Sequence, residues 1–543
     1  MPVHYDAVII GAGHNGLTCA AYLAKAGLTV RLLERRPVVG GAAVTEEFHP
    51  GFRNSTASYT VSLLNPKVIR DLRLERHGLR IIERPFSNFL PLADGGSFSL
   101  WPGAEAAHAE VARFSARDAA RLGDYFQTME RVAALLRELA LQTPPRLAGG
   151  WGDLFDGLRL GSQLRKLPLA SRRDALDLFT KSAGELLDWW FESEPLKAAL
   201  GFDSMVGNFA GPYSPGSAYG LLHHAFGEVN GKRGIWGHAL GGMGAITQAM
   251  LAEAAAHGAE ATTGVTVAQV RIRGGEAGGA SRAGGASRAY GVTLADGTQI
   301  DARAVVANVN PKLLYGKLVA PEHLDREFRN RIERWKCASG TLRMNVALSE
   351  LPDFSSKPGT HAQPHHGAGI IMAPSLAYME QAWSDARALG WARAPIIEML
   401  IPSTVDASLA PAGAHVASLF CQHFNPVLPD GRSWDEARDA AADLVIETVN
   451  HYAPNFRASV IGRKVLTPLD LEREFGLVGG DIFHGALTLD QLFAARPVLG
   501  YGDYRTPVQG LYLCGSGAHP GGGVTGAPGH NAAREILRDF QRR

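Results

Sequence analysis

Tyr5-Asp-Ala-Val-Ile-Ile10 runs directly into Gly11-Ala-Gly-His-Asn-Gly16, and this stretch decides the fold of the chain. The apolar run predicts a strand that is buried on both faces. Residues 17–26 are rich in Ala and Leu with helical spacing, and Gly27 follows them as a helix-ending residue. A second strand is predicted over 29–33. Strand, glycine-rich turn, helix and second strand in this order predict a dinucleotide-binding βαβ unit.

Each glycine of the turn has a physical role in such a unit. Gly11 permits the tight turn, Gly13 lets the backbone approach a pyrophosphate, and Gly16 lets helix and strand pack closely. The helix N-terminus supplies N–H donors and the positive end of a dipole. Glu34 ends the second strand, 21 residues after Gly13, where a carboxylate accepts hydrogen bonds from ribose hydroxyls. The alternative is a purely structural turn.

A glycine pair follows the acidic residue. Glu34 and Arg35 lead into Gly40-Gly41, which is typical of FAD-binding flavoproteins rather than of nicotinamide dehydrogenases. In the flavoproteins the pair lets the chain pass close to the ribityl and phosphate region. An ordinary turn is the alternative for this pair taken alone.

The C-terminal region is as rich in glycine as the N-terminal turn. Residues 510–515 predict a short buried strand, residues 516–529 a glycine-dense loop, and residues 530–540 a helix. Such density indicates backbone pressed against another group or backbone with positive φ. In flavoproteins this segment reaches the flavin, and its helix start faces the pyrimidine edge. A glycine-rich surface loop is the alternative. The residues predicted to contact the cofactor here are Gly515, Ser516, Gly522, Gly523 and Val524.

Three more segments are predicted to complete the cofactor domain. A strand is predicted over 261–270, and its Val267 belongs to the predicted cofactor-binding set. Residues 291–300 predict a hairpin that turns at Asp296-Gly297. Residues 304–308 predict a further buried strand.

Composition excludes several classes of protein. Lys plus Arg number 54 and Asp plus Glu 53, so no basic nucleic-acid surface is expected. The four cysteines form no C-x-x-C pair, so neither a dithiol centre nor a close-spaced zinc site is expected. No uninterrupted apolar run is long enough to span a membrane. The first predicted strand begins by about Tyr5, which leaves no room for a cleavable leader. The sequence therefore predicts a soluble cytoplasmic protein.

Several blocks along nearly the whole chain resemble the phytoene desaturase-like FAD-dependent oxidoreductases. They are Gly11–Gly16, Gly40–Glu47, Phe191–Leu196, Leu222–His224, Gly241–Gly244, Asp470–Glu472, Phe483-His484, Leu489–Gln491 and Leu511–Gly523. The resemblance implies an α/β fold of the glutathione-reductase type, with a Rossmann-like FAD-binding domain and a discontinuous α+β substrate domain. Many relatives place an acid after the terminal strand, whereas this chain has Ser516, whose hydroxyl can still form a hydrogen bond.

The predicted domains are both discontinuous. Residues 1–80, 235–310 and 461–543 form the FAD-binding domain, and residues 81–234 and 311–460 form the substrate or cap domain. The family places a sheet facing the flavin and a helical cap above it.

Catalytic residues are less distinct in the sequence. His519 and His238 lie in stretches that the family brings toward the flavin, and either imidazole could accept a proton. A structural role is the alternative for each. No Ser-His-Asp arrangement, paired carboxylates or metal site can be argued from spacing. The Trp189-Trp190-Phe191 run has two interpretations, a patch that dips into a membrane or the packing of a cap helix, and the flanking Asp188 and Glu192 favour packing.

Three functions are carried forward. The resemblance implies a desaturase or dehydrogenase that transfers a hydride from an apolar, polyene- or isoprenoid-like substrate to FAD. Dioxygen, a quinone or another carrier then reoxidises the flavin, and peripheral membrane contact stays open. The first alternative is an amine or small-metabolite oxidase on the same scaffold. The second is a binding or regulatory protein that FAD stabilises and that turns over little substrate.

Overall fold

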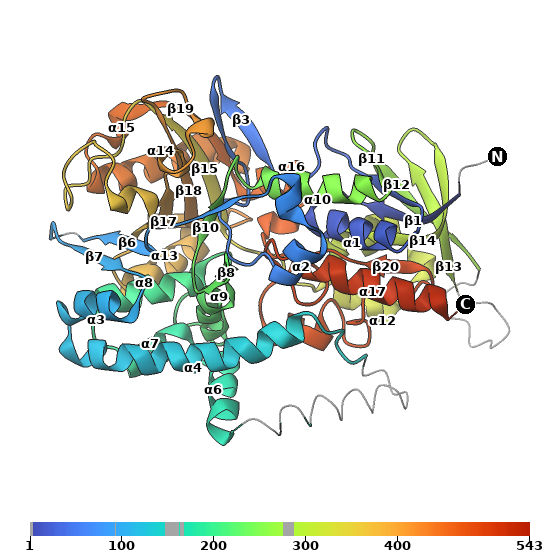
Figure 1. The fold of residues 1–543 in the computed structure, drawn as a ribbon, viewed down its shortest axis with the longest axis horizontal. Helices are drawn as coiled ribbons and strands as arrows, with labels where there is room; N and C mark the ends of the chain where they lie inside the picture. The colour runs from blue at the N-terminus through green and yellow to red at the C-terminus, as the bar shows by residue number, and fades with distance from the viewer. Residues whose placement is uncertain are drawn as a thin grey trace.

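The computed structural model describes residues 4–92, 94–146, 162, 165, 168–274 and 287–542. Two seven-stranded sheets organise these residues. The first lies in the half of the molecule that holds both chain ends, and the second lies in the opposite half (Figure 1).

The first sheet is the nucleotide-binding type that the opening stretch predicts. Its order is β11-β2-β1-β14-β13-β12, with β20 also paired to β14. The strands β1, β2, β11, β14 and β20 run parallel, and β12, β13 and β14 form an antiparallel extension. Their bounds are β1 His4–Ile10, β2 Val30–Leu33, β11 Glu260–Thr262, β12 Val267–Arg273, β13 Arg288–Leu294, β14 Gln299–Ala307 and β20 Leu511–Leu513.

The hairpin predicted over residues 291–300 has its turn where we expected it, but its second strand is longer than predicted. Leu294 N–H and Thr298 O close the turn, as the Asp296-Gly297 pair predicts. The strands predicted separately over 291–300 and 304–308 are in fact joined, because β14 continues without a break from Gln299 to Ala307. Its first residues pair with β13 and its later ones with β1 and β20, so one strand serves both parts of the sheet.

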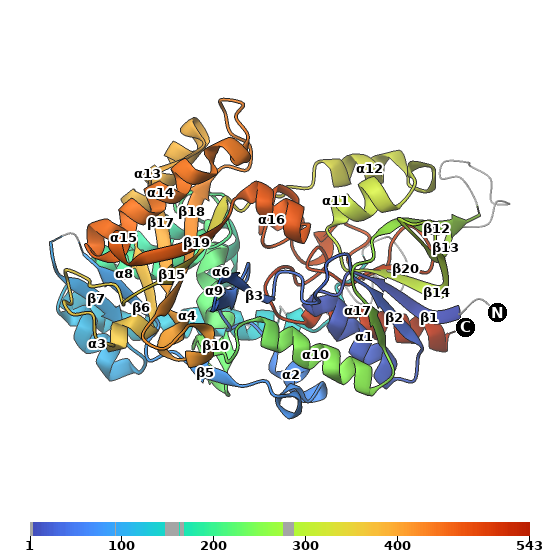
Figure 2. The same ribbon diagram turned by 90° about the horizontal axis from the view of Figure 1, so that it is seen from above.

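Helices flank the first sheet. Helix α1 (His14–Lys25) packs between α10 (Gly244–Ala256) and α17 (Ala527–Gln541), and the three lie side by side in Figure 2. The apolar core beneath them includes most of β1, β14 and β20, all buried. The N-terminal and C-terminal helices therefore share one layer.

The second sheet has the order β19-β15-β18-β17-β16-β6-β7 and is antiparallel except for the pair β16 and β6. Helices α13 (Leu376–Leu389) and α14 (Trp434–Tyr452) pack against it. The predicted domain boundaries stay a prediction. The strand bounds are β6 Asn88–Pro91, β7 Ser97–Leu100, β15 Thr341–Leu348, β16 Gly369–Met372, β17 Trp391–Leu400, β18 His415–Phe424 and β19 Val460–Leu466.

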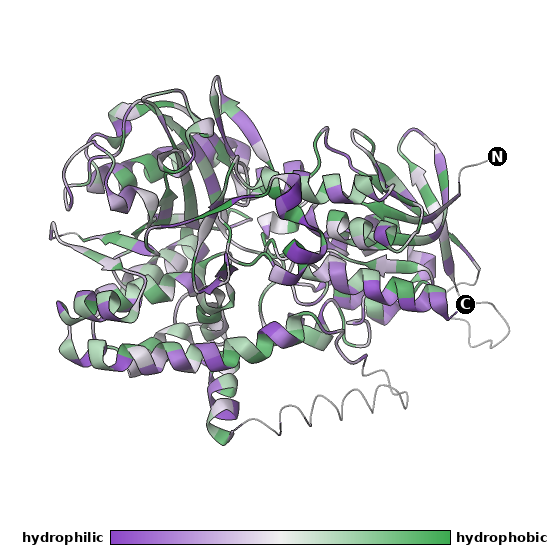
Figure 3. Cartoon of the chain, viewed as in Figure 1, coloured by the Kyte–Doolittle hydropathy of each residue, from purple (hydrophilic) through white to green (hydrophobic). Residues whose placement is uncertain are grey.

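A helical layer lies below the second sheet in Figure 1. Its longest member, α4, runs from beneath that sheet to the C-terminal segment and carries both polar and apolar residues along its length (Figures 1 and 3). No helix among the described residues is long and apolar enough to cross a membrane. The helices of this layer are α3 Ala104–Ala112, α4 Ala116–Ala140, α6 Leu169–Thr180, α7 Ala183–Trp190, α8 Glu194–Met205 and α9 Leu222–Phe226.

The packing interpretation of the tryptophan pair holds for only part of the run. Phe191 is buried at 3% exposure, but Trp189 is 64% exposed. Trp189 belongs to the last turn of α7, which ends at Trp190, and its ring lies on the outer face of that turn. The Arg121 guanidinium lies over this ring. Flanking acidic residues therefore did not distinguish a core tryptophan from a surface one.

The crossing of α1 and α17 depends on Gly529. A Cβ at this position would lie 2.2 Å from the carbonyl oxygen of Asn15 and 3.0 Å from Cβ of Thr18. Both partners belong to the first turns of α1, so a side chain here would push the two helices apart.

We expect Gly529→Ala to destabilise the protein by about 1–3 kcal/mol, because overpacking of this size forces backbone shifts. Its matched control is Gly123→Ala in α4, where a Cβ meets nothing within 4 Å. The control should be neutral or gain up to about 1 kcal/mol from helix propensity. Urea unfolding monitored by circular dichroism measures both, and equal stabilities would contradict the crossing constraint.

Candidate active site

The glycine turn after β1 is packed against the end of β14. A Cβ on Gly11 would lie 2.9 Å from the carbonyl oxygen of Asn308, and one on Gly16 would lie 2.3 Å from the Gly11 carbonyl oxygen. The Asn308 amide donates to that Gly11 oxygen at 3.2 Å. A Cβ on Gly515 would meet the Asn308 side chain at 3.0 Å. The structure therefore brings Gly11 of the N-terminal turn and Gly515 of the C-terminal segment to one asparagine.

The second glycine pair approaches the same turn. Gly40 N–H donates to the Ala12 carbonyl at 2.8 Å, and Gly13 bridges to Gly40. A Cβ on Gly41 would lie 3.1 Å from the Gly13 Cα. The backbone at Gly13 and Gly41 therefore carries no side chain at this close approach, as the passage of a pyrophosphate group requires.

Glu34, the acidic residue of the pattern, lies beside this turn, but the side chain of the next residue, Arg35, does not. Glu34 is buried, and its carboxylate accepts from Ala12 N–H at 2.8 Å and from Arg36 N–H at 2.9 Å. The Arg35 guanidinium points elsewhere, donating to the Arg473 and Glu474 carbonyls at the end of α16 (Pro468–Phe475). The structure thus does not bring the Arg35 side chain to the glycine cluster.

Val267 begins β12 and is buried. It lies two residues after Val265, whose N–H donates to the Glu34 carbonyl at 2.9 Å. Glu34 and Val267, both predicted to bind the cofactor, therefore lie on adjoining segments.

The start of α1 fits a dinucleotide. No side chain caps it and no acid lies in its first turn, so its N–H groups and positive dipole end remain for an anion. Asn15 donates to the Ser516 hydroxyl at 3.1 Å, while its buried Oδ1 has no partner among the residues that the structure describes. A buried acceptor without a donor is costly, and a cofactor hydroxyl would supply the donor. FAD carries both groups, phosphates and hydroxyls.

The C-terminal loop closes over the glycine turn. The His14 imidazole lies 3.1 Å from the Gly523 carbonyl, which joins the two ends of the chain. Gly522 passes so close to Phe483 that a Cβ would lie 2.4 Å from its ring. Residues 522–525, which include Val524, are half-buried rather than enclosed. Helix α17 behind them, like α1, has neither a side-chain cap nor an acid in its first turn.

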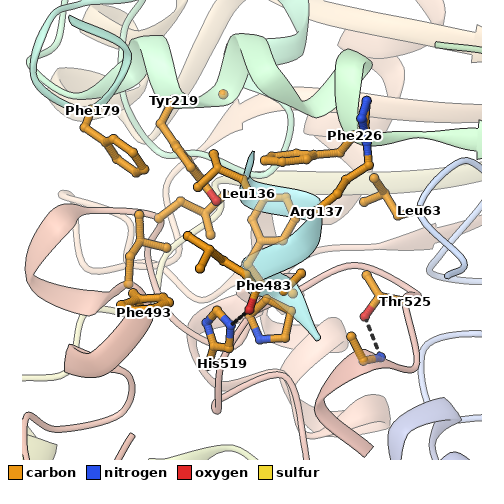
Figure 4. A pocket seen from close by; sticks show the side chains of 18 of the residues that line it. Leu63, Leu136, Arg137, Phe179, Tyr219, Phe226, Phe483, Phe493, His519 and Thr525 are labelled. Atoms are coloured by element: carbon orange, nitrogen blue, oxygen red, sulfur yellow. Dashed lines mark hydrogen bonds between the residues drawn. The ribbon is translucent and has the colours of Figure 1, made fainter. Parts of the chain in front are cut away.

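A cavity of about 400 Å³ lies against this loop. Figure 4 shows its aromatic and aliphatic side chains converging from the helical layer and from the C-terminal segments. Leu489 is 55% exposed and lines the cavity, so the mouth lies there. Its apolar lining includes Leu63, Leu135, Leu136, Leu139, Phe179, Val206, Tyr219, Phe226, Phe483, Leu487, Leu489, Leu492 and Phe493, and its polar lining includes Asn65, Arg137, Asp203, Asn208, His519 and Thr525.

His519 is the candidate histidine that lines the cavity. Its Nε2 lies 3.0 Å from the Leu139 carbonyl and donates to it, so Nδ1 carries the lone pair. Within the described part of the chain, Nδ1 has no partner. The ring stands edge-on to Phe493. Burial lowers the pKa of His519 to about 4, so the imidazole is neutral near pH 7.

His238 is not brought to this cavity. It lies on β10 (Gly237–Ala239), which pairs with β5 (Ile81–Glu83), and its Nε2 is 2.9 Å from the Asp406 carboxylate. Asp406 also accepts from Gly241 N–H. This geometry is that of a buried hydrogen bond between an imidazole and a carboxylate on separate segments, and the two candidate histidines therefore occupy separate places.

Sequence reasoning missed four residues of the site. His14 and Asn15 stand inside the glycine pattern, and Asn308 ends a predicted strand, so their positions were visible although their contacts were not. Arg496 holds the C-terminal loop and follows no pattern. Among the described residues, no group of three or more His, Cys, Asp or Glu could hold a metal ion.

Comparison with known proteins agrees with this geometry. Residues 16–341 match the family model "Flavin containing amine oxidoreductase". The chain is 42% identical to pyridine nucleotide-disulfide oxidoreductase domain-containing protein 2 of Rattus norvegicus, across 99% of this chain and 94% of the rat protein. It is 26% identical to the phytoene desaturase (lycopene-forming) of Pantoea ananas, across 96% of each. A putrescine oxidase structure with bound putrescine shares the fold, with TM-score 0.58, 15% identity and full coverage of both chains.

We expect the free energy of unfolding to fall as pH is lowered from 7 to 5. Burial lowers the pKa of His519 to about 4 and those of His365 and His423 to about 3. The unfolded chain binds these protons below its pKa of about 6.5 while the folded chain does not, so each histidine contributes a slope of up to about 1.4 kcal/mol per pH unit.

Urea unfolding at a series of pH values measures this dependence. His423→Asn removes one buried imidazole and should reduce the slope between pH 7 and 5. A wild-type stability that is unchanged or higher at pH 5 would contradict the buried neutral state of these rings.

Proposed function

This chain belongs to the flavin containing amine oxidoreductase family, and we propose that it oxidises an apolar, polyene- or isoprenoid-like substrate by removing a hydride. The protein is an FAD-dependent oxidoreductase. The single observation that supports the substrate class is the cavity of about 400 Å³, whose wall is mostly apolar and whose one side is the C-terminal loop. The likeness to a phytoene desaturase is in keeping with it.

The residues of the cavity would bind and orient such a substrate. Leu136, Phe483 and Phe493 offer apolar contact and exclude water, which keeps the reacting carbon dry. When bound, FAD accepts a hydride from a C–H bond. Dioxygen, a quinone or another carrier then takes the electrons.

His519 is our candidate for the group that accepts the proton lost together with the hydride. Hydride loss leaves an electron-poor carbon, so the neighbouring C–H becomes strongly acidic, and its bonding pair forms the new double bond. A weakly basic imidazole can accept such a proton. The Nδ1 lone pair of His519, which has no partner among the described residues, would be the acceptor, while the Leu139 carbonyl holds the ring through Nε2.

An amine substrate is the second candidate, and one side chain favours it. Asp203 lines the cavity, and its carboxylate could hold an ammonium group of a substrate. The family description and the fold shared with putrescine oxidase are in keeping with this alternative. A flavoprotein that binds ligands without turnover is the third.

Anaerobic absorbance spectra of the purified FAD-loaded protein decide among the three. We expect the flavin bands to bleach when isoprenoids or polyenes are added and to persist with amines. Bleaching with amines alone would establish the second candidate. Bands that persist with every substrate class, at full FAD occupancy, would support the binding protein.

We expect Leu489→Glu to raise the KM for an apolar substrate roughly tenfold, equivalent to about 1.4 kcal/mol, because a carboxylate at the mouth opposes apolar contact. Leu499→Glu is the matched control, since Leu499 is 56% exposed and does not line the cavity. If the substrate is an amine, Leu489→Glu should leave KM unchanged or lower it. Steady-state kinetics of the two variants separates these outcomes.

A further inference from the structure

Arg496 is a fully buried cation whose donors all go to carbonyl groups. Its exposure is 0%. Nε and Nη2 donate to the Ser516 oxygen at 3.0 and 2.8 Å, and Nη2 also donates to the Phe483 oxygen at 2.6 Å. Nη1 donates to the Gln491 oxygen at 3.1 Å and to the Gly485 oxygen at 3.3 Å. One guanidinium therefore ties together three separate backbone segments.

The nearby acid is occupied by other donors. Asp481 is buried, and its two oxygens accept from the N–H groups of Phe483, Gly485 and Ala338 and from the Ser339 hydroxyl. Within the described ranges, no carboxylate oxygen lies within 4.0 Å of the Arg496 guanidinium. Its charge is thus balanced at a distance rather than by a contact ion pair.

Burial does not neutralise this cation. It lowers the pKa of Arg496 to about 10, so the guanidinium is still protonated near neutral pH. A buried charge acts through a lower effective dielectric than a surface charge, so its potential extends further into its surroundings. His519, in the wall of the cavity, is one affected group, because the Arg496 charge adds to the lowering of its pKa by burial.

The cation lies against the C-terminal loop at two points. Besides the Ser516 carbonyl, a Cβ on Gly521 would lie 3.5 Å from the guanidinium carbon. His519 and Gly522, on either side of Gly521, line the cavity, and Phe483, whose carbonyl Arg496 binds, lines it as well. Arg496 therefore contacts two segments that line the cavity.

We propose that Arg496 is a positioning residue for the C-terminal loop and that its buried charge stabilises the negative charge that the flavin gains on reduction. The proposal rests on FAD lying along residues 515–524 and not on the identity of the substrate. A preorganised cation stabilises a charge that develops during reaction without any reorganisation at that moment. Lysine can supply the charge without the planar fork, and glutamine can supply donors without the charge.

The first test uses the wild-type FAD-loaded protein and measures its midpoint potential from pH 6 to pH 8 with redox dyes and a chemical reductant. If the cation keeps the two-electron reduced flavin anionic, one proton is taken up per two electrons. The potential then falls by about 30 mV per pH unit, the value for a tenfold change in a two-electron couple. A fall of about 59 mV per unit, for two protons, would overturn the charge role.

The second test compares Arg496→Gln with Arg496→Lys by the same measurement. We expect Arg496→Gln to lower the potential by at least the equivalent of tenfold, about 30 mV, and to steepen its pH dependence. Arg496→Lys should keep the wild-type pH dependence and lower the FAD content, because the fork on Ser516 is lost. Unchanged potentials in both variants would overturn the charge role, and full FAD content in both would overturn the positioning role.

The wild-type measurement decides the charge role even if Arg496→Gln does not fold. The potential is measured without substrate, so failure of the isoprenoid proposal leaves these outcomes unaffected. Loss of FAD in both variants together with a steep wild-type slope would leave Arg496 a purely structural residue.

Discussion

The close approach of bare backbone around Asn308 is the constraint on which the rest of the structure depends. The asparagine directly follows β14, donates to the first glycine of the N-terminal turn and would collide with a side chain at Gly515. Gly13 and Gly41 meet at the neighbouring contact. Only residues without Cβ let the strands converge there, and the same lack of side chains opens the start of α1 to a phosphate. The fold and the proposed cofactor site thus depend on one packing requirement.

The substrate side is held to that centre by the C-terminal end of α4. The Leu139 carbonyl lies 3.0 Å from His519, the Ala140 carbonyl accepts from Asn531, and the Leu141 carbonyl accepts from Arg534. Helix-end carbonyls have no partner within their own helix, so these side chains satisfy groups that burial would otherwise penalise. Because α4 also lines the cavity, the same contacts set the distance between the cavity wall and the C-terminal loop.

Local pattern explains why part of the molecule was predictable. The turn from Gly11 to Gly16 and the strand-loop-helix after residue 510 depend on short-range chemistry, and the structure has them where the sequence places them. Long-range contacts were not predictable in this way. The residues next to Arg496 in the sequence do not indicate that it binds the Ser516 carbonyl. Those next to Arg35 do not indicate that its side chain donates to α16. Trp189 was misjudged because its exposure depends on where α7 ends against neighbouring helices.

The buried polar groups near the cavity differ in how burial acts on them. Imidazole responds to a dry site by giving up its proton, so His519 stays neutral and keeps a lone pair. Guanidinium cannot respond in this way at neutral pH, so Arg496 keeps its charge and must be satisfied by carbonyls. A site with a permanent cation and a weakly basic neutral ring suits a reaction in which negative charge moves to the cofactor and the departing proton is already acidic. An apolar wall around them strengthens both effects, because it excludes the water that would screen the cation and compete for the proton.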